Sequence, residues 1–573
     1  MKLSKRHAAL IATGIAGAMA LTACGGGSGN NDSGSGSSSG GRVIYGEATD
    51  WPENLFQGIS AGNATSTQNI MGRVLPSPFI VKPDFSVVYD KNLLASEPKL
   101  DTSGGGQVIT YEINKDAVWS DGTPISADDF IYTWKAQRSA DPADGGCEGV
   151  LSTNGYANIS DVKGSDDGKT VTVTFKPSYA DWQAVFGPIY PAHIMANDDP
   201  ATQCQTFTTG WPIADGVPSD ISGGPWQVLK KNIDVGGQVI VLTPNPKWWG
   251  DKAKLDQLVI QGIGNDPTTA VQGLQNQELG VIYPQPQLDL VDQVEALKPN
   301  VTSKITFGLS FEHLDFNTSD PNLADPNVRK AFAMALDRQE IVDQTVGQVA
   351  PDAQVLDNHL YVNNQPQYAD NAPEQYQAQD VAGAKALLEK SGYELGADGV
   401  YAKGRQRLSF RIDTTPGNAL RETTITVMAQ QLAQAGIEVT YNPNPDLFSG
   451  PDTPTSVVAG GFQIALFAST GSPFATSLIP SYQSPARGFG QNVSRAGTAA
   501  IDALLDKVAT DQDAAQQAAD ANAADELLWE QMATLPLFQK PTLVAYDSAL
   551  RGVQNNASQS GVLWNSDDWS LRK

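Results

Sequence analysis

The sequence predicts an α/β protein built from several domains, and three observations lead to this prediction. With 573 residues, the chain is long enough for about three or four folding units. Its first half contains short stretches rich in Thr, Val and Ile that alternate at the period of a strand, at 108–113, 170–175 and 238–242. Its second half alternates such strands with amphipathic helices, a pattern typical of a sheet covered by helices.

The clearest single unit is a predicted β-α-β motif between residues 408 and 441. A strand at 408–412 is followed by a helix that ends at Gly436, and a second strand occupies 437–441. Because a helical crossover joins parallel strands, we expect these two strands to pair in parallel. The same lobe should contain a strand at 462–467 and helices near 501–505 and 527–532. A crevice is expected at the carboxyl ends of its strands.

Two helix starts are indicated by their capping residues. Ser126 and Asp129 stand at the spacing of a capping box, in which the hydroxyl satisfies a free amide and the carboxylate reaches back. Asp325 precedes Pro326, the order typical of an N-cap and the first helical position. We therefore expect helices at 130–137 and from 326 onward.

Charge and composition exclude several functions. The chain carries 38 Lys and Arg against 63 Asp and Glu, a net charge of -25, which argues against a nucleic-acid partner and an anionic membrane surface. Histidines are few and lack metal-ligand spacing, so neither a metal nor another cofactor is expected. A G-x-S-x-G match at 58–62 lacks the apolar strand of a nucleophile elbow. An enzyme is thus unsupported.

The N-terminus predicts export and lipid anchoring. A basic start and an apolar run at 8–20 form a signal peptide that is too short to span a bilayer. The residues around Cys24 (LTAC) resemble a bacterial lipoprotein box, which implies cleavage after residue 23 and lipidation of Cys24. The alternative is ordinary cleavage that leaves Cys24 free. Residues 24–41 then form a flexible tether rich in Gly and Ser.

The two other cysteines, Cys147 and Cys204, are expected to form a disulfide. An exported chain with two such cysteines most simply pairs them in an oxidising compartment. The loop that the bond closes would stabilise the fold by about 4 kcal/mol in the chain-entropy model. Two free thiols are the alternative.

Several segments together resemble the extracellular solute-binding proteins of family 5, the peptide-type receptors of ABC importers. The landmarks lie in the family's order at 119–130 (WSDGTPISADDF), 222–226 (SGGPW), 245–250 (NPKWWG), 316–317 with 328–338, and 535–538 (LPLF). The resemblance implies a two-lobed periplasmic-binding-protein fold of type II, with an extra subdomain and a hinge. It also implies a monomer that carries a peptide or related small solute to an ABC permease in the membrane.

The resemblance also sets expected domain boundaries. Lobe one takes residues 42–305 and 540–573, and its extra subdomain takes 75–215. Lobe two takes residues 306–539.

One loop departs from the pattern of peptide-binding members, in which an Asp holds the ligand's ammonium group. The loop after the strand at 462–467 reads ASTGSPF, with hydroxyls where the carboxylate would stand. The segment 179–186 (YADWQAVF) resembles an actinobacterial branch of the family, some members of which are linked to cell-envelope glycolipids. A regulatory or scaffolding lipoprotein of glycolipid assembly is therefore the alternative function.

The resemblance and the strand ends nominate ligand-binding residues, each with a structural alternative. Glu47, Asp50 and Trp51 lie in the first folded segment, where an exposed acidic turn is the alternative. Tyr283 and Gln285 flank prolines near the lobe crossing, where facing away from the cleft is the alternative. Others follow strands of the second lobe: Asn317, Phe467, Ser469, Ser472 and Asn492. For Asn317, support of the hinge backbone is the competing role.

Overall fold

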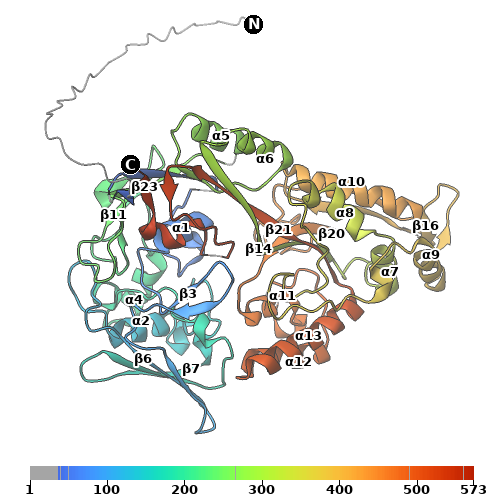
Figure 1. Cartoon of the computed structure of the whole chain (residues 1–573). Coiled ribbons are helices and arrows are strands. Elements are labelled where there is room, and N and C mark those ends of the chain that lie inside the picture. Colours follow the sequence, from blue (N-terminus) through green and yellow to red (C-terminus); the bar gives the residue numbers. More distant parts are fainter. Residues whose placement is uncertain are drawn as a thin grey trace, which may run out of the picture.

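The chain folds into two lobes that lie side by side (Figure 1). The computed structural model describes residues 37–38, 40–49, 51–264, 266–488, 491–558 and 560–572. The predicted signal peptide, Cys24 and Asp50 therefore lie outside the described residues. Two long strands, β14 (Val301–Phe316) and β21 (Thr534–Asp547), run from one lobe into the other. This arrangement confirms the predicted two-lobed α/β fold.

One mixed sheet extends through both lobes. Its strand order is β10 (Ile233–Asp234), β11 (Val239–Pro244), β12 (Gln257–Gly262), β2 (Arg42–Glu47), β13 (Val281–Ile282), β21, β14, β20 (Ile464–Thr470), β18 (Ser409–Thr414) and β19 (Glu438–Pro443), with β9 (Trp226–Gln227) beside β11. In its first-lobe half, β12 and β13 pair in parallel with β2. In its second-lobe half, β18 pairs in parallel with β19, as the predicted β-α-β motif requires.

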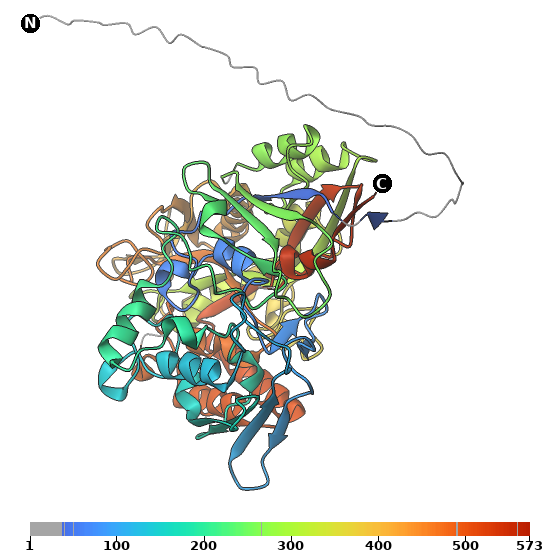
Figure 2. The ribbon, with the colours of Figure 1, turned by 90° about the vertical axis from the view of Figure 1, so that its left-hand side faces the viewer.

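The first lobe carries an additional unit within the stretch proposed as the extra subdomain, low in Figure 2. It contains the hairpin β3 (Phe79–Val81) and β4 (Val87–Tyr89) and a sheet ordered β5 (Lys99–Asp101), β6 (Gln107–Glu112), β8 (Thr170–Phe175) and β7 (Ile159–Gly164). Its helices are α2 (Ala127–Gln137), α3 (Ala192–Met195) and α4 (Pro200–Thr209). Elsewhere in this lobe lie α1 (Thr65–Met71), α5 (Pro267–Gln275) and α6 (Leu288–Glu295).

The second lobe places helices on both sides of its part of the sheet (Figure 1). One group contains α7 (Pro326–Met334), α8 (Arg338–Gln344), α9 (Val381–Lys390) and α10 (Ala419–Gln434). The other contains α11 (Ile479–Tyr482), α12 (Ala499–Thr510) and α13 (Ala514–Gln531). Two small sheets complete the chain, β15 (Glu394–Leu395) with β16 (Tyr401–Lys403) and β17 (Gln406–Arg407), and β1 (Ser37–Ser38) with β23 (Ser570–Arg572) and β22 (Leu550–Arg551).

The predicted capping box at the start of α2 is confirmed, and it explains the longest sequence landmark. The Asp129 carboxylate accepts hydrogen bonds from the Ser126 and Ala192 amides and from the Trp119 indole. Burial raises the pKa of this carboxyl to about 6. Trp119, the first residue of the WSDG landmark, is therefore a fully buried core residue of the first lobe, whereas Asp121 is exposed.

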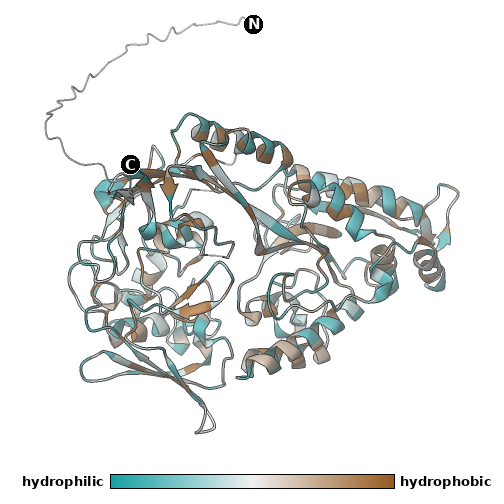
Figure 3. Cartoon of the chain, viewed as in Figure 1, coloured by the Kyte–Doolittle hydropathy of each residue, from teal (hydrophilic) through white to brown (hydrophobic). Residues whose placement is uncertain are grey.

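The helices carry both apolar and polar residues, coloured brown and teal in Figure 3. The first lobe has a large core that includes Trp119, Trp226 and Trp569, and the second lobe has another that includes Phe316, Phe332 and Trp529. Each lobe therefore has a core of its own. We propose that the boundaries between the two lobes lie at residue 305, within β14, and at residue 540, within β21.

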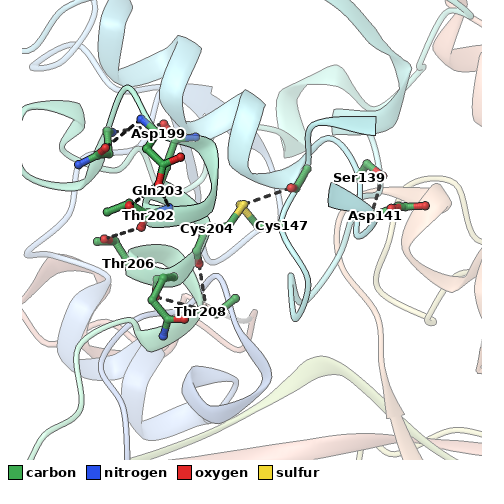
Figure 4. Close-up of a disulfide and its surroundings, with 12 residues drawn as sticks. Ser139, Asp141, Cys147, Asp199, Thr202, Gln203, Cys204, Thr206 and Thr208 are labelled. Atoms are coloured by element: carbon green, nitrogen blue, oxygen red, sulfur yellow. Dashed lines mark hydrogen bonds between the residues drawn. A yellow bond between two sulfur atoms is a disulfide. The ribbon is translucent and has the colours of Figure 1, made fainter. Parts of the chain in front are cut away.

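The predicted disulfide between Cys147 and Cys204 is present (Figure 4). It joins the loop after α2 to α4, with the two Cα atoms 5.1 Å apart. Asp199 caps α4 by accepting a hydrogen bond from the Thr202 amide, 3.0 Å away. The disulfide thus fixes the periphery of the extra unit, away from the crossing strands.

A buried ion triad lies where the strands cross between the lobes. Glu312 of β14 is 1% exposed, and its carboxylate contacts Arg421 of α10 and Lys540 of β21 at 3.0 Å each. Burial alone raises the pKa of this carboxyl, but Lys540 and Arg421 together lower it to about 2. The β14–β21 pairing shifts register on both sides of this position, between Phe307 and Phe311 and after Glu312. The triad therefore joins both crossing strands to the second lobe.

We predict that Glu312→Gln lowers the free energy of unfolding by about 3–5 kcal/mol, because it leaves two buried cations without their anion. Urea unfolding at pH 7 measures the change. The exposed Glu530→Gln serves as the matched control and should change stability by no more than about 0.5 kcal/mol. Equal stability of the two variants would contradict the role of the triad.

The contribution of Glu312 should also depend on pH. Its pKa lies near 2 in the folded chain and near 4.5 in the unfolded chain. The stabilisation is therefore fully present above about pH 4.5 and is lost as the pH falls toward 2. The stability difference between wild type and Glu312→Gln should shrink over this range in urea titrations at successive pH values. A constant difference down to pH 2 would refute this assignment.

Candidate functional site

Strand β20 has an open edge close to the crossing point of the two lobes. On one side, it pairs with β14 from Ser310–Thr470 to Phe316–Ile464. On the other side, only Ile464 and Ala465 pair with β18, so residues 466–470 have no second neighbouring strand among the described residues. Open strand edges present N–H and C=O groups that an extended ligand can pair with.

A cavity of about 330 Å³, which we call the interlobe cavity, begins at the loop that follows this strand. The second lobe contributes Ser472, Pro473, Phe474 and Ser477. The first lobe contributes residues around α1, β3 and β4 and the aromatic side chains Trp248, Trp249 and Trp564. Because both lobes line it, a change in the angle between them would open or close this cavity.

The interlobe cavity offers amides, hydroxyls and aromatic surface with little free charge. Its one arginine, Arg73, donates to both carboxylate oxygens of Asp567 at 2.9 Å. Burial raises the pKa of Asp90, the acidic group in the lining. The polar lining also includes Gln57, Gln68 and Asn69. Such a lining favours ligands that bind through hydrogen bonds and ring contacts.

A second cavity of about 270 Å³ lies wholly within the second lobe, and we call it the second-lobe cavity. The predicted residues Phe467 and Ser469 line it, together with His313 and Asp315 of β14. The remaining lining is Phe448, Val457, Val458, Ser481, Tyr482, Gln491, Val493 and Thr534. The other predicted residue of this strand and loop, Ser472, lines the interlobe cavity. Its hydroxyl donates to the Phe474 carbonyl at 3.1 Å and thereby shapes the turn.

The predicted first-lobe residues are more dispersed. Glu47 is buried, and its carboxylate accepts hydrogen bonds from Asn69 at 2.7 Å and from the Thr49 hydroxyl at 2.8 Å. Because Asn69 lines the interlobe cavity, Glu47 orients a cavity side chain. Trp51 and Tyr283 pack against the first-lobe core, and burial raises the pKa of Tyr283 to about 12. Gln285 lines a small pocket of about 20 Å³ beside Lys540.

Two predicted amides hold loops of the second lobe. Asn317 donates to the Gly460 and Phe462 carbonyls at 3.1 and 2.8 Å. Asn492 donates to the Gln483 carbonyl at 2.8 Å and accepts from the Ser494 hydroxyl at 2.7 Å. Both side chains are buried and position the segments that flank the second-lobe cavity.

The lobes also touch through the segment 179–186, whose role the sequence left open. Buried Asp181 accepts hydrogen bonds from the Thr476 amide and the Gln517 side chain, each at 2.9 Å. The Ala180 amide donates to the Ala509 carbonyl at 2.8 Å, and the Tyr179 hydroxyl lies 2.9 Å from that of Thr476. Thr476 belongs to the loop that lines the interlobe cavity, so this contact holds that loop against the first lobe.

A buried aromatic side chain adds to the contact between lobes. Phe85, in the β3–β4 hairpin of the first lobe, packs in the same core as Leu309 and Tyr361 of the second. Its φ of 64° lies in the left-handed region, which non-glycine residues rarely adopt. The hairpin thus holds a strained turn that places this ring across the boundary.

Sequence reasoning missed several of these groups. The histidines were noted only for their lack of metal-ligand spacing, yet His313 lines a cavity beside Asp315. Phe448 and Asp181 carried no individual signal, because their partners lie far away in the chain. Among the described residues, there is no group of three or more His, Cys, Asp or Glu side chains placed to hold a metal ion. No helix in the same residues has the length and apolar character of a membrane span.

The chain is similar to known binding proteins over most of its length. It is 30% identical over 517 residues to the oligopeptide-binding protein OppA of Mycobacterium tuberculosis, covering 88% of this chain and 80% of that one. A protein of the same organism described as an uncharacterized lipoprotein is 25% identical over 595 residues, or 97% of this chain and 96% of that one. A third relative there, the probable monoacyl phosphatidylinositol tetramannoside-binding protein LpqW, is 30% identical over 349 residues, covering 60% of this chain and 50% of that one.

The chain is also similar to a protein of known structure. The periplasmic EDTA-binding protein EppA superimposes with a TM-score of 0.85 at 28% identity, covering 94% of this chain and 98% of that one. The profile of the bacterial extracellular solute-binding proteins, family 5 Middle, matches residues 91–489, which is more than half of the sequence. The chain therefore belongs to family 5 of the bacterial extracellular solute-binding proteins.

Proposed function

We propose that this protein is a lipid-anchored receptor that closes its two lobes around a peptide or related small solute and presents it to an ABC permease. The observation that carries the proposal is the interlobe cavity, which both lobes line next to an open strand edge. Family membership and the relative named as an oligopeptide-binding protein support it. The receptor binds and releases its solute without chemical change and works as a monomer.

In this proposal, closure is a hinge motion about β14 and β21. The two strands connect the sheets of both lobes, and their register shifts at Phe307–Phe311 provide a place to bend. When the lobes meet, Asp181 accepts a hydrogen bond from the Thr476 amide. This bond holds the 472–477 loop over the solute. Opening breaks these contacts and exposes the cavity to solvent.

The strand edge favours a ligand with an extended backbone. Residues 466–470 can offer main-chain hydrogen bonds, which recognise a peptide without regard to its side chains. Ser469, near the end of β20, and Ser472, in the loop that follows, offer hydroxyls rather than a carboxylate, so no acidic side chain at these positions holds a ligand ammonium group. The solute would then be bound through its backbone and its uncharged groups.

The proposed location is the outer face of the cytoplasmic membrane. The lipoprotein box at Cys24 supplies the anchor, and the tether of residues 24–41 gives the folded part reach above the bilayer. A full-length relative described as a lipoprotein supports this placement. The anchor would keep the receptor close to its permease.

A second function uses the same cavity for a different ligand. The relative named as a probable binder of a phosphatidylinositol tetramannoside, together with the hydroxyl-bearing loop, favours a regulatory or scaffolding lipoprotein of glycolipid assembly. The two functions differ in the molecule that the cavity holds.

We predict that Asp181→Ala opens the protein, because the Thr476 amide and the Gln517 side chain lose a buried acceptor, at a cost of about 1–3 kcal/mol. Small-angle scattering should give a larger radius of gyration than for wild type. Asp198→Ala, an exposed aspartate of the same unit, is the matched control and should scatter like wild type. An unchanged radius in Asp181→Ala would contradict its role in closure.

Native mass spectrometry of residues 42–573 purified from the native host tests the function itself. We expect a bound peptide mixture that mild denaturation releases. A released glycan or glycolipid would support the envelope function instead. A protein that carries nothing and binds no added peptide, glycan or glycolipid would contradict both.

A further inference from the structure

The second-lobe cavity has a polar end built from three side chains of two paired strands. His313 Nε2 lies 3.2 Å from Asp315 Oδ2, and the Thr534 hydroxyl donates to Asp315 Oδ1 at 2.7 Å. Both oxygens of the carboxylate are therefore engaged. With Nε2–H donating to the carboxylate, the neutral imidazole keeps a lone pair on Nδ1.

That lone pair has no partner in the described part of the chain. The side chain of His313 is 4% exposed, and Nδ1 is buried without a hydrogen bond. A buried polar atom without a partner costs about 1–3 kcal/mol, which a suitable ligand would recover. His313 and Asp315 both line the cavity, so a molecule bound there would lie next to this imidazole.

The rest of the lining is mainly aromatic and aliphatic, with Ser469, Ser481 and Gln491 as its other polar residues. Phe467 stands edge-on to His313, with ring centroids 4.4 Å apart, and Phe448 stands edge-on to Phe467 at 5.3 Å. Phe448 is 55% exposed, which is unusual for a large apolar side chain that lines a cavity. Val457, Val458 and Val493 complete the apolar lining. An open aromatic edge beside apolar walls is suited to receive another ring.

Size and charge narrow the class of ligand. The volume of about 270 Å³ exceeds the roughly 150 Å³ that accommodates benzene in a protein interior. No Lys or Arg side chain lines the cavity, so an anionic group would find no countercharge among the described residues. A sugar ring would place hydroxyls against the valines and phenylalanines, where unpaired polar groups are costly.

We propose that the second-lobe cavity binds an uncharged aromatic ring with a hydrogen-bond donor, a phenol or an indole, as one part of the solute. The ring packs against Phe448 and Phe467, and its O–H or N–H donates to His313 Nδ1. This inference rests on the proposed receptor function. Ser469 lines this cavity and Ser472 lines the interlobe cavity, so one ligand laid along the open edge of β20 reaches both.

Isothermal titration calorimetry of residues 42–573 with three neutral probes tests the assignment. N-acetyl-tyrosinamide and N-acetyl-tryptophanamide should bind, and N-acetyl-phenylalaninamide, which lacks the ring donor, should bind about tenfold more weakly. Ser469→Phe fills the cavity and should weaken all three by at least about tenfold. Phe448→Ala removes the ring at the mouth and should weaken all three, whereas Leu395→Ala, an apolar side chain of similar exposure (53%), should not.

His313→Leu removes the acceptor and should remove the preference for the tyrosine probe over the phenylalanine probe. If that variant fails to fold by circular dichroism, Ser469→Phe and Phe448→Ala carry the test. The inference is overturned if wild type binds no probe, binds a methyl mannoside more tightly than N-acetyl-tyrosinamide, or binds equally well after Ser469→Phe. The receptor proposal survives these outcomes, because the co-purified solute tests it separately.

Discussion

The carboxylate of Glu312 connects the parts of the chain that would stay together in the proposed hinge motion. It lies on β14 and forms ion pairs with Lys540 of β21 and Arg421 of α10. The side chain is almost completely buried. A carboxylate at that depth is tolerated because two cations surround it. The crossing strands are thereby fixed to the second lobe at one end, while their register shifts leave the adjoining segment less regular.

The fixed position of β14 also determines where the two cavities lie. Because β20 pairs with β14 up to Thr470, the loop that follows it is held near the crossing point, where both lobes can reach it. Ser472, Pro473, Phe474 and Ser477 of that loop line the interlobe cavity, and Thr476 contacts Asp181. The same strand presents Phe467 and Ser469 to the second-lobe cavity. A single strand and its loop therefore link the hinge, the contact between lobes and both cavities.

Local patterns allowed much of the fold to be predicted from sequence. The capping box at Ser126 and the parallel strand pair around the 419–434 helix depend on residues at most a few tens of positions apart. Both could therefore be predicted from the sequence alone. The Cys147–Cys204 bond followed from the number of cysteines and the exported location. The landmark Trp119 proved to be a core residue, whose indole donates to the Asp129 carboxylate.

The site was less predictable because it is assembled from distant segments. Asp181 contacts Thr476 and Gln517, which lie 295 and 336 positions away in the sequence. No local sequence pattern indicates such a contact. Strand ends drew attention to Phe467, Ser469 and Ser472, which line cavities. The amides of Asn317 and Asn492 instead bind backbone, because loops that border a cavity need internal acceptors and donors of their own.

The central claim is that a solute lies between the two lobes beside the open edge of β20. The most direct test is a crystal structure of the protein purified from its native host with its bound molecule retained. The account predicts ligand density that contacts residues 466–477 of the second lobe and the α1 and β3 segments of the first. Ligand density confined to another surface, with the interlobe cavity occupied by water alone, would contradict it.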